Sequence, residues 1–433
     1  MKKHIVILSI LTLAIAGCNG GNTPEQGNGK GVDSMPKSLK RGVAFNFVNI
    51  EDLPLLSPYI SWDYNWGNTA NDNAALWFDT NDMDYCPMCW NGSYNAGKIR
   101  EYVAAHPKTK YLLAFNEPNL TDQARMTPKE AAAIWQPVVA LAKELNLKLV
   151  SPAMNYGTLS GYSDPEKWLD EFFAQPEVDI NDIYAISIHC YMASAGGVKS
   201  FVEKFYKYNK PIWLTEFCAW DPVPGSVETQ MSYMSNVLNY LETNDKVERY
   251  SWFIPRTNKS VDTAPYMQLL THDDPPALTD LGKMYAYFST FDKSCYLNTT
   301  RMIHAGEYAA VSDNAVQVRA NTDDVVTSGA RKEGLKVVNM APGQAVIYQL
   351  NVTTSSSSKA INVRYSSYSD CILAVYIDDK FYNYLNMPRT GDANAWQVTN
   401  SAISISKGMH TLKLELYSGS CNISGFEIMG TDD

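Results

Sequence analysis

Two short apolar runs in this sequence end on a glutamate. Residues 111–115 lead into Asn116-Glu117-Pro118, and residues 212–214 lead into Thr215-Glu216. Both runs have the length and bulky composition of a buried strand. Proline has no N–H and a fixed φ, so the first strand should end at Pro118. Each glutamate is therefore predicted at the C-terminal end of a strand, where barrel enzymes carry their chemistry.

Two carboxyl groups in one cleft can cleave a glycosidic bond. One must be protonated to donate to the leaving oxygen, and the other must be ionised to attack the anomeric carbon or activate water. A retaining enzyme holds the two groups about 5–5.5 Å apart. The alternative for Glu117 is a solvated turn residue, since short motifs misfire. The second stretch, which ends on Glu216, favours the functional interpretation.

The segments around these glutamates predict a parallel (β/α)₈ TIM barrel over residues 39–295, because strand-like runs alternate with helical patterns. Thr127 before Pro128 is a helix start. A doubly wound open sheet is the alternative, but no Gly-rich phosphate motif follows the first run. The strand-like runs are 42–46, 60–66, 84–90, 111–119, 147–154, 183–191, 212–217 and 250–254, and the helical ones are 127–145, 166–174, 198–208 and 226–242.

Further polar and aromatic residues fall at or near the predicted strand ends and are candidates for substrate binding. Tryptophans suit sugar rings but also pack barrel mouths, and Trp252 is the preferred platform because it lies on the last strand. For His189, a satisfied core histidine is the alternative to a role in the site. The candidates are Asn46, Trp66, Trp90, Asn116, His189, Tyr191, Trp220 and Trp252.

A series of motifs in this region resembles the Asl1-like catalytic domain, glycoside hydrolase family 128 of clan A. The resemblance implies a retaining enzyme that cleaves β-1,3-glucan. The motifs keep the family's order, which makes the set more specific than any one of them. They are Lys40-Arg41-Gly42, Tyr64-Asn65-Trp66-Gly67, Pro87-Met88-Cys89-Trp90, Phe115-Asn116-Glu117-Pro118-Asn119, Ser151-Pro152-Ala153 and Pro211-Ile212-Trp213-Leu214-Thr215-Glu216-Phe217.

The same resemblance assigns roles. Glu117 is the acid/base and Glu216 the nucleophile, while Asn116 holds the sugar 2-OH, Tyr191 steadies Glu216, and His189 lines the site. The pKa of Glu117 should then be raised by partial burial and by the charge of Glu216. Cys190 stands where the family usually has an aromatic residue, so the shape of that subsite departs from the pattern.

After about Cys295, helical periods give way to short alternating strands separated by turn signals. Residues 296–433 are therefore predicted to form an antiparallel β-sandwich. The expected strands are 345–352, 361–365, 372–377, 410–417 and 423–428, and an Asp378-Asp379-Lys380 turn closes the third.

The order of motifs in the sandwich resembles a family 6-like carbohydrate-binding module. The resemblance implies sugar binding by Asn422 and Trp396, although Trp396 matches the family's more structural tryptophan. A purely structural sandwich is the alternative. Structural calcium is common in such modules, but no loop of EF-hand type is present. The motifs are Ala305-Gly306-Glu307-Tyr308, Gly343–Tyr348, Pro388-Arg389-Thr390-Gly391, Trp396, Lys407–Leu412 and Asn422-Ile423.

The N-terminus carries an export signal. Lys2-Lys3 precede an apolar stretch, residues 5–16, that is too short to span a bilayer. It ends in Ile15-Ala16-Gly17-Cys18, which resembles a bacterial lipobox and implies cleavage before Cys18 and acylation of its thiol. Residues 1–18 are thus a lipoprotein signal and 19–38 a flexible Asn/Gly-rich tether. An ordinary secretory signal with a chance cysteine is the alternative. We expect an exported, membrane-anchored protein of the bacterial cell envelope.

Composition limits the partners. The formal charge of −10, with no basic stripe, argues against nucleic acid. No zinc spacing is present, and we expect no catalytic cofactor or metal. Cys86-Pro87-Met88-Cys89 imitates a redox motif but lies in a barrel-strand pattern, so it is interpreted as structural. Cys371 and Cys421 are candidates for a disulfide within the sandwich.

Three functional hypotheses follow. The leading one is an anchored, monomeric retaining endo-β-1,3-glucanase. The second keeps the mechanism but changes the substrate to another β-glucan or a mannan. The third is a non-catalytic surface lipoprotein that binds glycans. The presence of both glutamates argues against it.

Overall fold

The structure is a computed structural model that describes residues 31–260, 264, 266–321 and 333–430. The predicted signal peptide, its Cys18 and tether residues 19–30 lie outside the described residues. Tether residues 31–38 do not match the prediction, because they pack against the folded chain. Val32 exchanges backbone hydrogen bonds with Tyr296 and Asn298, both at 2.8 Å, and Ser38 is buried.

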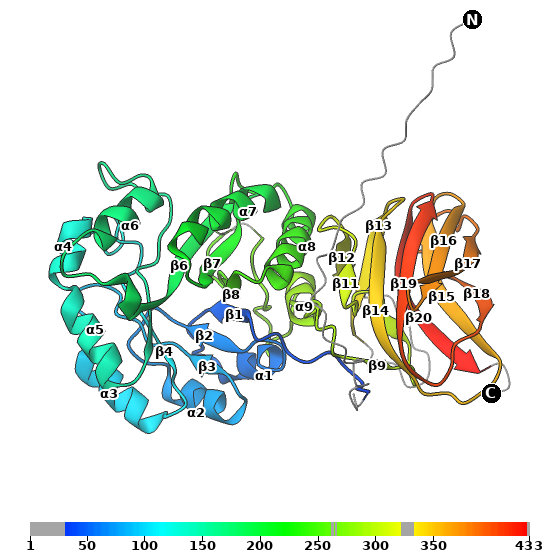
Figure 1. The fold of residues 1–433 in the computed structure, drawn as a ribbon, viewed down its shortest axis with the longest axis horizontal. Coiled ribbons are helices and arrows are strands. Elements are labelled where there is room, and N and C mark those ends of the chain that lie inside the picture. Colours follow the sequence, from blue (N-terminus) through cyan, green and yellow to red (C-terminus); the bar gives the residue numbers. More distant parts are fainter. Residues whose placement is uncertain (1–30, 261–263, 265, 322–332, 431–433) are drawn as a thin grey trace, which may run out of the picture. The chain divides into compact units, whose positions relative to one another are not determined.

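An eight-stranded parallel sheet forms the first domain, and helices surround it (Figure 1). The strand order is β3-β2-β1-β8-β7-β6-β5-β4. Backbone hydrogen bonds from Leu113 to Pro87 and from Cys89 to Leu113 link the two edges of this order, which gives a TIM-like barrel. The strands are β1 (Arg41–Ala44), β2 (Trp62–Tyr64), β3 (Asp84–Tyr85), β4 (Tyr111–Leu113), β5 (Lys148–Val150), β6 (Ile183–Met192), β7 (Ile212–Asp221) and β8 (Val247–Trp252).

Six of the nine helices in the described chain, α3, α4 and α6–α9, begin after a residue whose side chain caps the first turn. Thr127 and Glu130 form a capping box with Pro128 at the first turn, as the sequence predicts. The single helix expected over 127–145 is wrong, because the chain breaks at Ile134 into α4 and α5. The helices are α1 (Leu53–Leu56), α2 (Asp72–Thr80), α3 (Ala96–Ala105), α4 (Pro128–Ala133), α5 (Trp135–Glu144), α6 (Pro165–Phe173), α7 (Ala195–Lys204), α8 (Val227–Thr243) and α9 (Asp280–Tyr287), with 3₁₀ turns η1 (Ile50–Asp52), η2 (Ile180–Asp182) and η3 (Phe205–Tyr208).

One buried ion pair fastens the first strand to two helices. The Arg41 side chain is 1% exposed and bonds to Glu242 of α8 at 2.6 Å. Its remaining N–H groups donate to Tyr250 and to backbone carbonyls at the end of α9, including Tyr285 at 2.8 Å. Removing one partner would leave an uncompensated buried charge, which costs about 3–5 kcal/mol. This pair therefore helps to fix α8 and α9 against the barrel.

The C-terminal region consists mostly of antiparallel strands in two sheets, with a sandwich-like arrangement. One sheet has the order β12-β13-β20-β15-β18 and the other β11-β14-β19-β16-β17. Asp378 and Asp379 both have positive φ in the predicted turn before β17. The strands are β9 (Leu297–Asn298), β10 (Ile303–His304), β11 (Ala310–Val311), β12 (Gln317–Ala320), β13 (Leu335–Met340), β14 (Ala345–Val352), β15 (Lys359–Ser367), β16 (Cys371–Ile377), β17 (Lys380–Met387), β18 (Gln397–Ile403), β19 (Gly408–Ser418) and β20 (Cys421–Gly430).

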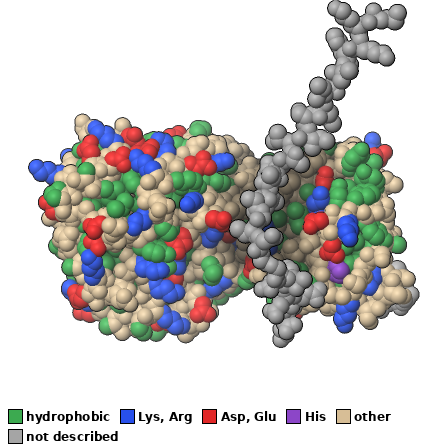
Figure 2. All heavy atoms as spheres, viewed as in Figure 1, with side chains coloured by type: hydrophobic (Ala, Val, Ile, Leu, Met, Phe, Trp, Pro, Cys, Tyr) green, Lys and Arg blue, Asp and Glu red, His purple; other side chains and the backbone are tan. Residues whose placement is uncertain are grey.

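The five strands that the sequence predicts correspond to β14, β15, β16, β19 and β20. Strands β17 and β18 were not predicted, because most of their side chains are exposed and polar residues interrupt the alternation. Charges of both signs are interspersed over the face of the barrel in Figure 2. Within the described part of the chain, no helix combines the length and the apolar character needed to cross a membrane.

Candidate active site

Glu117 is presented by the turn that follows β4. Its backbone N–H bonds to the carbonyl of Ala153 at 3.0 Å, and that of Asn116 bonds to Trp90 at 2.9 Å. These bonds hold the turn against both neighbouring strands. The backbone of Glu117 has a φ of 43°, a conformation that non-glycine residues seldom adopt. Such backbone strain clusters at functional sites, and here it accompanies a carboxylate that is only 6% exposed.

Glu216 lies within β7 and is 4% exposed. Its register partner on β6 is His189, and Tyr191 is two residues further along the same strand. Side chains at i and i+2 of a strand share a face, so both point toward the same side of the sheet. The parallel pairing of β6 and β7 thus places His189 and Tyr191 beside the Glu216 carboxylate.

Several donors converge on Glu216. Oε1 accepts hydrogen bonds from the Tyr64 hydroxyl at 2.8 Å and the Trp66 indole N–H at 2.7 Å. Oε2 accepts one from the Tyr191 hydroxyl. Donors that bond to the charged form of a carboxylate stabilise that form. These bonds favour the anionic form of Glu216 and act against the burial that raises its pKa.

His189 lies between the two glutamates. Its Nδ1 is 2.9 Å from Oε1 of Glu117 and 3.4 Å from Oε2 of Glu216. Asn155 donates a further bond to Oε1 of Glu117 at 3.0 Å. One potential ligand atom from each of Glu117, His189 and Glu216 lies within 4.8 Å of the others, and no second such group of three is found among the described residues. This spacing also suits a proton shared among the three side chains.

The pKa values of these groups follow from burial and from their mutual charges. Burial acts to raise the pKa of Glu117, but the charge of His189 and the bonds from His189 and Asn155 outweigh it and hold that pKa below its ordinary value. Burial, with the charge of Glu117, raises the pKa of Glu216. Burial acts to lower the pKa of His189, but the charges of Glu216 and Glu117 raise it overall.

The predicted raised pKa for Glu117 is therefore wrong. The physical reason is His189, whose positive charge lies against Glu117 and stabilises the carboxylate. The same charges that raise the pKa of His189 favour a proton on its imidazole. The 2.9 Å distance between Nδ1 and Oε1 is short enough for a proton to pass between the imidazole and Glu117.

A cleft of about 510 Å³ opens over these groups at the C-terminal end of the barrel strands. Tyr191, Trp220 and Phe253 contact one another with ring centroids 5.5–5.9 Å apart, and Trp66 lies 5.9 Å from Phe253. Aromatic faces beside acidic groups match the apolar and polar faces of a sugar. The lining residues are Trp66, Trp90, Asn116, Glu117, Leu120, Gln123, Asn155, Tyr191, Glu216, Trp220, Asp221 and Phe253.

Comparison with known proteins identifies the family. Residues 42–285 match the family described as glycosyl hydrolase catalytic core. The chain belongs to this family. Residues 314–429 of this glycosyl hydrolase match a second family, described as carbohydrate binding module (family 6). The first match covers the barrel and its cleft, and the second covers most of the antiparallel sheets.

Solved structures similar to this glycosyl hydrolase include two GH128 subgroup II endo-β-1,3-glucanases. The enzyme from Pseudomonas viridiflava is 37% identical, with a TM-score of 0.53, and the match covers 58% of this chain and 98% of that one. The enzyme from Sorangium cellulosum is 34% identical, with a TM-score of 0.51, and the match covers 57% and 97%.

A curated relative is alkali-sensitive linkage protein 1 of Schizosaccharomyces pombe. It is 26% identical over 254 residues, or 56% of this chain. The match spans 42% of the length of that relative.

The structure of this glycosyl hydrolase brings most of the predicted site residues together, with two exceptions. Trp252 is fully buried, donates its indole N–H to Met267 at 2.7 Å and packs on Phe217, so its prediction as a sugar platform is wrong. Asn46 is exposed, accepts a bond from Asn65 at 3.2 Å and does not line the cleft. Side chains alternate along a strand, and Trp252 points into the layer between β8 and the helices.

Cys190 does not shape the cleft, because it is 2% exposed and packs in the core outside the barrel strands. Cys86 and Cys89 are also buried thiols, and burial raises the pKa of Cys86 to about 12. Such thiols are unreactive, as the structural interpretation of their motif requires. Cys371 and Cys421 are free thiols in this structure rather than the expected disulfide.

The sequence did not single out several side chains of the site. Tyr64 and Asn155 contact the two glutamates directly, and Phe253, Gln123 and Asp221 line the cleft. Tyr64 ends the second strand-like run beside Trp66, a position that signals the site once the barrel is assumed. Asn155 sits in a loop, and nothing in its local sequence indicates the contact.

In the carbohydrate-module region, the predicted residues are engaged within the protein. Trp396 is half-buried, with Lys336 and Arg364 at 5.4 and 4.8 Å from its ring centroid. The Asn422 amide accepts a bond from the Asn339 N–H at 2.8 Å and donates to Ser366 at 3.1 Å.

A row of exposed aromatic rings instead follows β17 and β19. Phe381, Tyr384 and Tyr417 are 50%, 45% and 60% exposed. Phe381 lies 4.8 Å from Tyr384, and Tyr384 lies 5.2 Å from Tyr417, between ring centroids. The sequence signal was the aromatic-rich segment 381–384, which follows the predicted turn.

Proposed function

We propose that this protein is a retaining glycoside hydrolase that cleaves β-1,3-glucan chains internally. The observation that carries the proposal is the placement of Glu117 and Glu216 against the same His189 nitrogen in an aromatic cleft. The two similar solved enzymes are β-1,3-glucanases by description, which supports this substrate.

The spacing of the two carboxyl groups supports the retaining mechanism. Retaining glycosidases hold them about 5–5.5 Å apart, while inverting enzymes leave about 6.5–9.5 Å for a water molecule. One oxygen of Glu117 lies within 4.8 Å of one oxygen of Glu216. Little room remains for a catalytic water between them.

The donor pattern supports the division of roles. In the first step Glu216 attacks the anomeric carbon while Glu117 gives its proton to the leaving oxygen, and a covalent glycosyl-enzyme forms. In the second step Glu117 deprotonates a water that releases the sugar with retained configuration. Tyr64, Trp66 and Tyr191 hold Glu216 in place for attack. Asn116, whose buried Oδ1 has no hydrogen-bond partner within the described chain, is available to a sugar hydroxyl.

Hydrolysis of a polysaccharide panel tests the substrate. Release of reducing ends from laminarin and curdlan, with a ladder of oligosaccharides as early products, is the expected result. A single small product from the start would indicate exo cleavage. Activity only on a mixed-linkage glucan or a mannan would show that β-1,3-glucan is not the substrate. Binding to laminarin without hydrolysis would establish a non-catalytic glycan-binding protein.

We propose that the C-terminal module binds glycan through the row of Phe381, Tyr384 and Tyr417. Exposed rings in line offer stacking faces to successive sugars. In a laminarin affinity gel, Tyr384→Ala should lose most of the retardation, whereas Trp396→Ala should keep it. Loss of retardation in Trp396→Ala but not in Tyr384→Ala would instead place the binding site at Trp396 and Asn422. Equal mobility of all variants with and without laminarin would leave the module a structural one.

We also propose that the protein is a monomeric lipoprotein of the bacterial cell envelope, acylated at Cys18. Several acyl chains anchor a protein stably, where one does not. The intact mass of the membrane-extracted protein should exceed that of the processed chain by the acyl groups, and Cys18→Ala should abolish the difference. An unmodified mass in the membrane fraction would contradict the proposal.

A further inference from the structure

A second cavity lies at the opposite end of the barrel from the catalytic cleft. Its lining includes the first residues of three strands, Asp84 of β3, Tyr111 of β4 and Val247 of β8, and Pro211, which directly precedes β7. The cleft, by contrast, lies at the strand C-termini. The volume of this barrel-floor cavity is about 1260 Å³.

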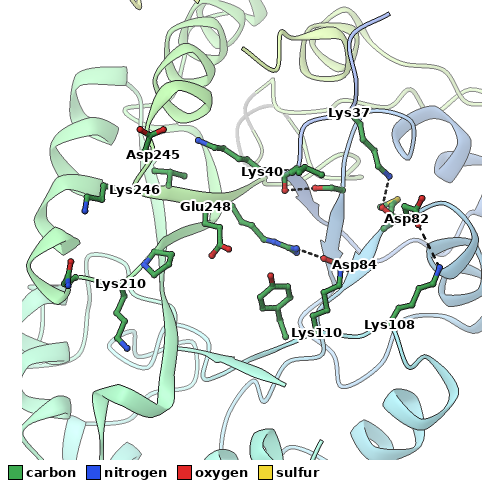
Figure 3. Close-up of a pocket in the computed structure, with 18 of the residues that line it drawn as sticks. Lys37, Lys40, Asp82, Asp84, Lys108, Lys110, Lys210, Asp245, Lys246 and Glu248 are labelled. Atoms are coloured by element: carbon green, nitrogen blue, oxygen red, sulfur yellow. Dashed lines mark hydrogen bonds and ion pairs between the residues drawn. The ribbon is translucent and has the colours of Figure 1, made fainter. Parts of the chain in front are cut away.

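The barrel-floor cavity is rich in basic side chains in an otherwise acidic protein. Seven Lys and Arg residues line it against four Asp and Glu, while the whole chain has a formal charge of −10. Figure 3 shows the labelled lysines on several separate segments of the chain around the cavity, with Lys37 and Lys108 on one side and Lys210 and Lys246 on the other. The basic residues are Lys37, Lys40, Lys108, Lys110, Lys210, Lys246 and Arg249.

Two of the lining acids, Asp84 and Glu248, already have bonding partners. Asp84 pairs with Arg249 and, at 2.9 Å, with Lys110. Glu248 accepts bonds from Tyr184 at 2.6 Å and Trp213 at 3.0 Å. Part of the positive charge is balanced within the lining, and seven basic residues against four acidic ones leave a formal excess of three positive charges.

Arg249 supplies an unused donor at the base of the cavity. Arg249 is 7% exposed, and its guanidinium carbon lies 4.4 Å from the ring centroid of Tyr111 and 4.8 Å from that of Trp213. Nη2 bonds to Asp84, but Nη1 is buried with no hydrogen-bond partner within the described chain. A buried donor without an acceptor is unfavourable, so an acceptor at this point would stabilise the site.

Two ammonium groups on the same cavity are also free. Within the described residues, the side chains of Lys210 and Lys246 make no hydrogen bond or ion pair. They flank β7 and β8, which they precede by two residues and one residue. Lys37 and Lys40, by comparison, are taken up by backbone carbonyls at 2.7–3.2 Å.

We propose that the barrel-floor cavity binds a phosphate group through Lys210, Lys246 and Lys110, with Arg249 at its base. Several separate ammonium groups and a guanidinium suit a dianion whose oxygens face different directions, whereas a carboxylate carries one charge in one plane. The phosphate comes either from a soluble phosphate ester or from the headgroup of an anionic phospholipid. The inference is independent of the glycosidase proposal, since it uses none of the cleft residues.

The test uses the full-length protein and two probes. Isothermal titration with pyrophosphate reports the soluble source. Cosedimentation with phosphatidylglycerol vesicles, measured as the excess over phosphatidylcholine vesicles, reports the lipid source. Comparison of the two vesicle types removes any contribution of an acyl anchor, which binds both.

The variant Lys210→Glu/Lys246→Glu should lose at least tenfold in affinity for the probe that binds. The matched control Lys129→Glu/Lys199→Glu makes the same change of charge on exposed residues of α4 and α7. It should bind as the wild type does. Equal melting temperatures of the two double variants would show that both are folded.

If Lys210→Glu/Lys246→Glu loses the binding of pyrophosphate, the phosphate comes from a soluble ester. If it loses the preference for phosphatidylglycerol vesicles, the phosphate belongs to a lipid headgroup. Added NaCl should weaken either one, because salt screens exposed charges. No saturable binding of either probe would overturn the proposal, as would an equal loss of affinity in both double variants or no loss in the first.

Discussion

The Nδ1 atom of His189 lies 2.9 Å from Oε1 of Glu117 in the centre of the cleft. The histidine is fully buried, so this contact is formed away from bulk water. A proton on the imidazole is therefore within one hydrogen bond of the group proposed to act as acid. His189 also lies 3.4 Å from Glu216, which couples the ionisation of all three side chains.

This coupling predicts the titration of His189. The charge of Glu216 is the largest influence that raises the pKa of His189, so Glu216→Gln should lower that pKa. A raised histidine pKa stabilises the fold fully below pH about 6.5, and the stabilisation is lost as the pH rises through the folded pKa. NMR titration of the His Cε1–H signals measures the shift, since the chain has only 6 histidines and His189→Asn assigns the signal. An unchanged His189 pKa in Glu216→Gln would show that the two groups are not coupled.

Glu216→Gln should lower kcat on laminarin by roughly three orders of magnitude or more, because the amide cannot attack the anomeric carbon. The circular dichroism spectrum and melting temperature should remain those of a folded protein. Azide should partly restore turnover to Glu216→Ala by attacking the vacated side of the sugar, and the product should be a glycosyl azide of inverted anomeric configuration. Undiminished hydrolysis by Glu216→Gln would refute the assignment.

Tyr64→Phe should lower kcat by about tenfold to a hundredfold, because a hydrogen bond to a charged group contributes about 1.5–3 kcal/mol. The lost hydroxyl is the one that donates to Oε1 of Glu216 at 2.8 Å. Tyr233→Phe is a matched control, since its hydroxyl is buried with no hydrogen-bond partner within the described residues. Steady-state kinetics on laminarin should leave the control at the wild-type rate. Equal losses in both variants would mean that the effect is one of packing.

Substitution of Trp252 should affect the stability of the fold, and substitution of Trp220 should affect substrate binding. Trp252→Phe removes a fully buried indole and its bond to Met267, and should lower the free energy of unfolding by about 1–3 kcal/mol with little change in KM. Trp220→Ala removes a ring that lines the cleft and should raise KM roughly tenfold, which corresponds to a loss of about 1.4 kcal/mol of binding. Urea denaturation and laminarin kinetics on both variants measure the two effects. A raised KM in Trp252→Phe at unchanged stability would restore its role as a platform.

The sequence predicted the parallel barrel and its order of strands because each strand carries its own signal. Apolar runs such as 111–115 and 212–217 are local, and so is the capping box of Thr127 and Glu130. It missed the break at Ile134 and strands β17 and β18, whose formation depends on neighbours in space. Local patterns can be read from consecutive residues, whereas the pairing of strands depends on segments that are distant in the sequence.

The catalytic candidates show the same division. Strand-end position selected Glu117, Glu216, His189 and Tyr191 from the sequence, since parallel strands bring their C-terminal ends to one edge. It could not tell which side chain on a strand end faces inward, and Trp252 points into the packing layer.

The sequence by itself determined the two carboxylates and the strands that carry them, because these are properties of consecutive residues. Only the tertiary structure decided their ionisation. The pKa values of Glu117, Glu216 and His189 depend on burial and on charges brought within 2.9–3.4 Å from the turn after β4, from β6 and from β7. Electrostatic energy at that distance depends on position in space, and residues 72 positions apart in the chain become neighbours only when the barrel forms.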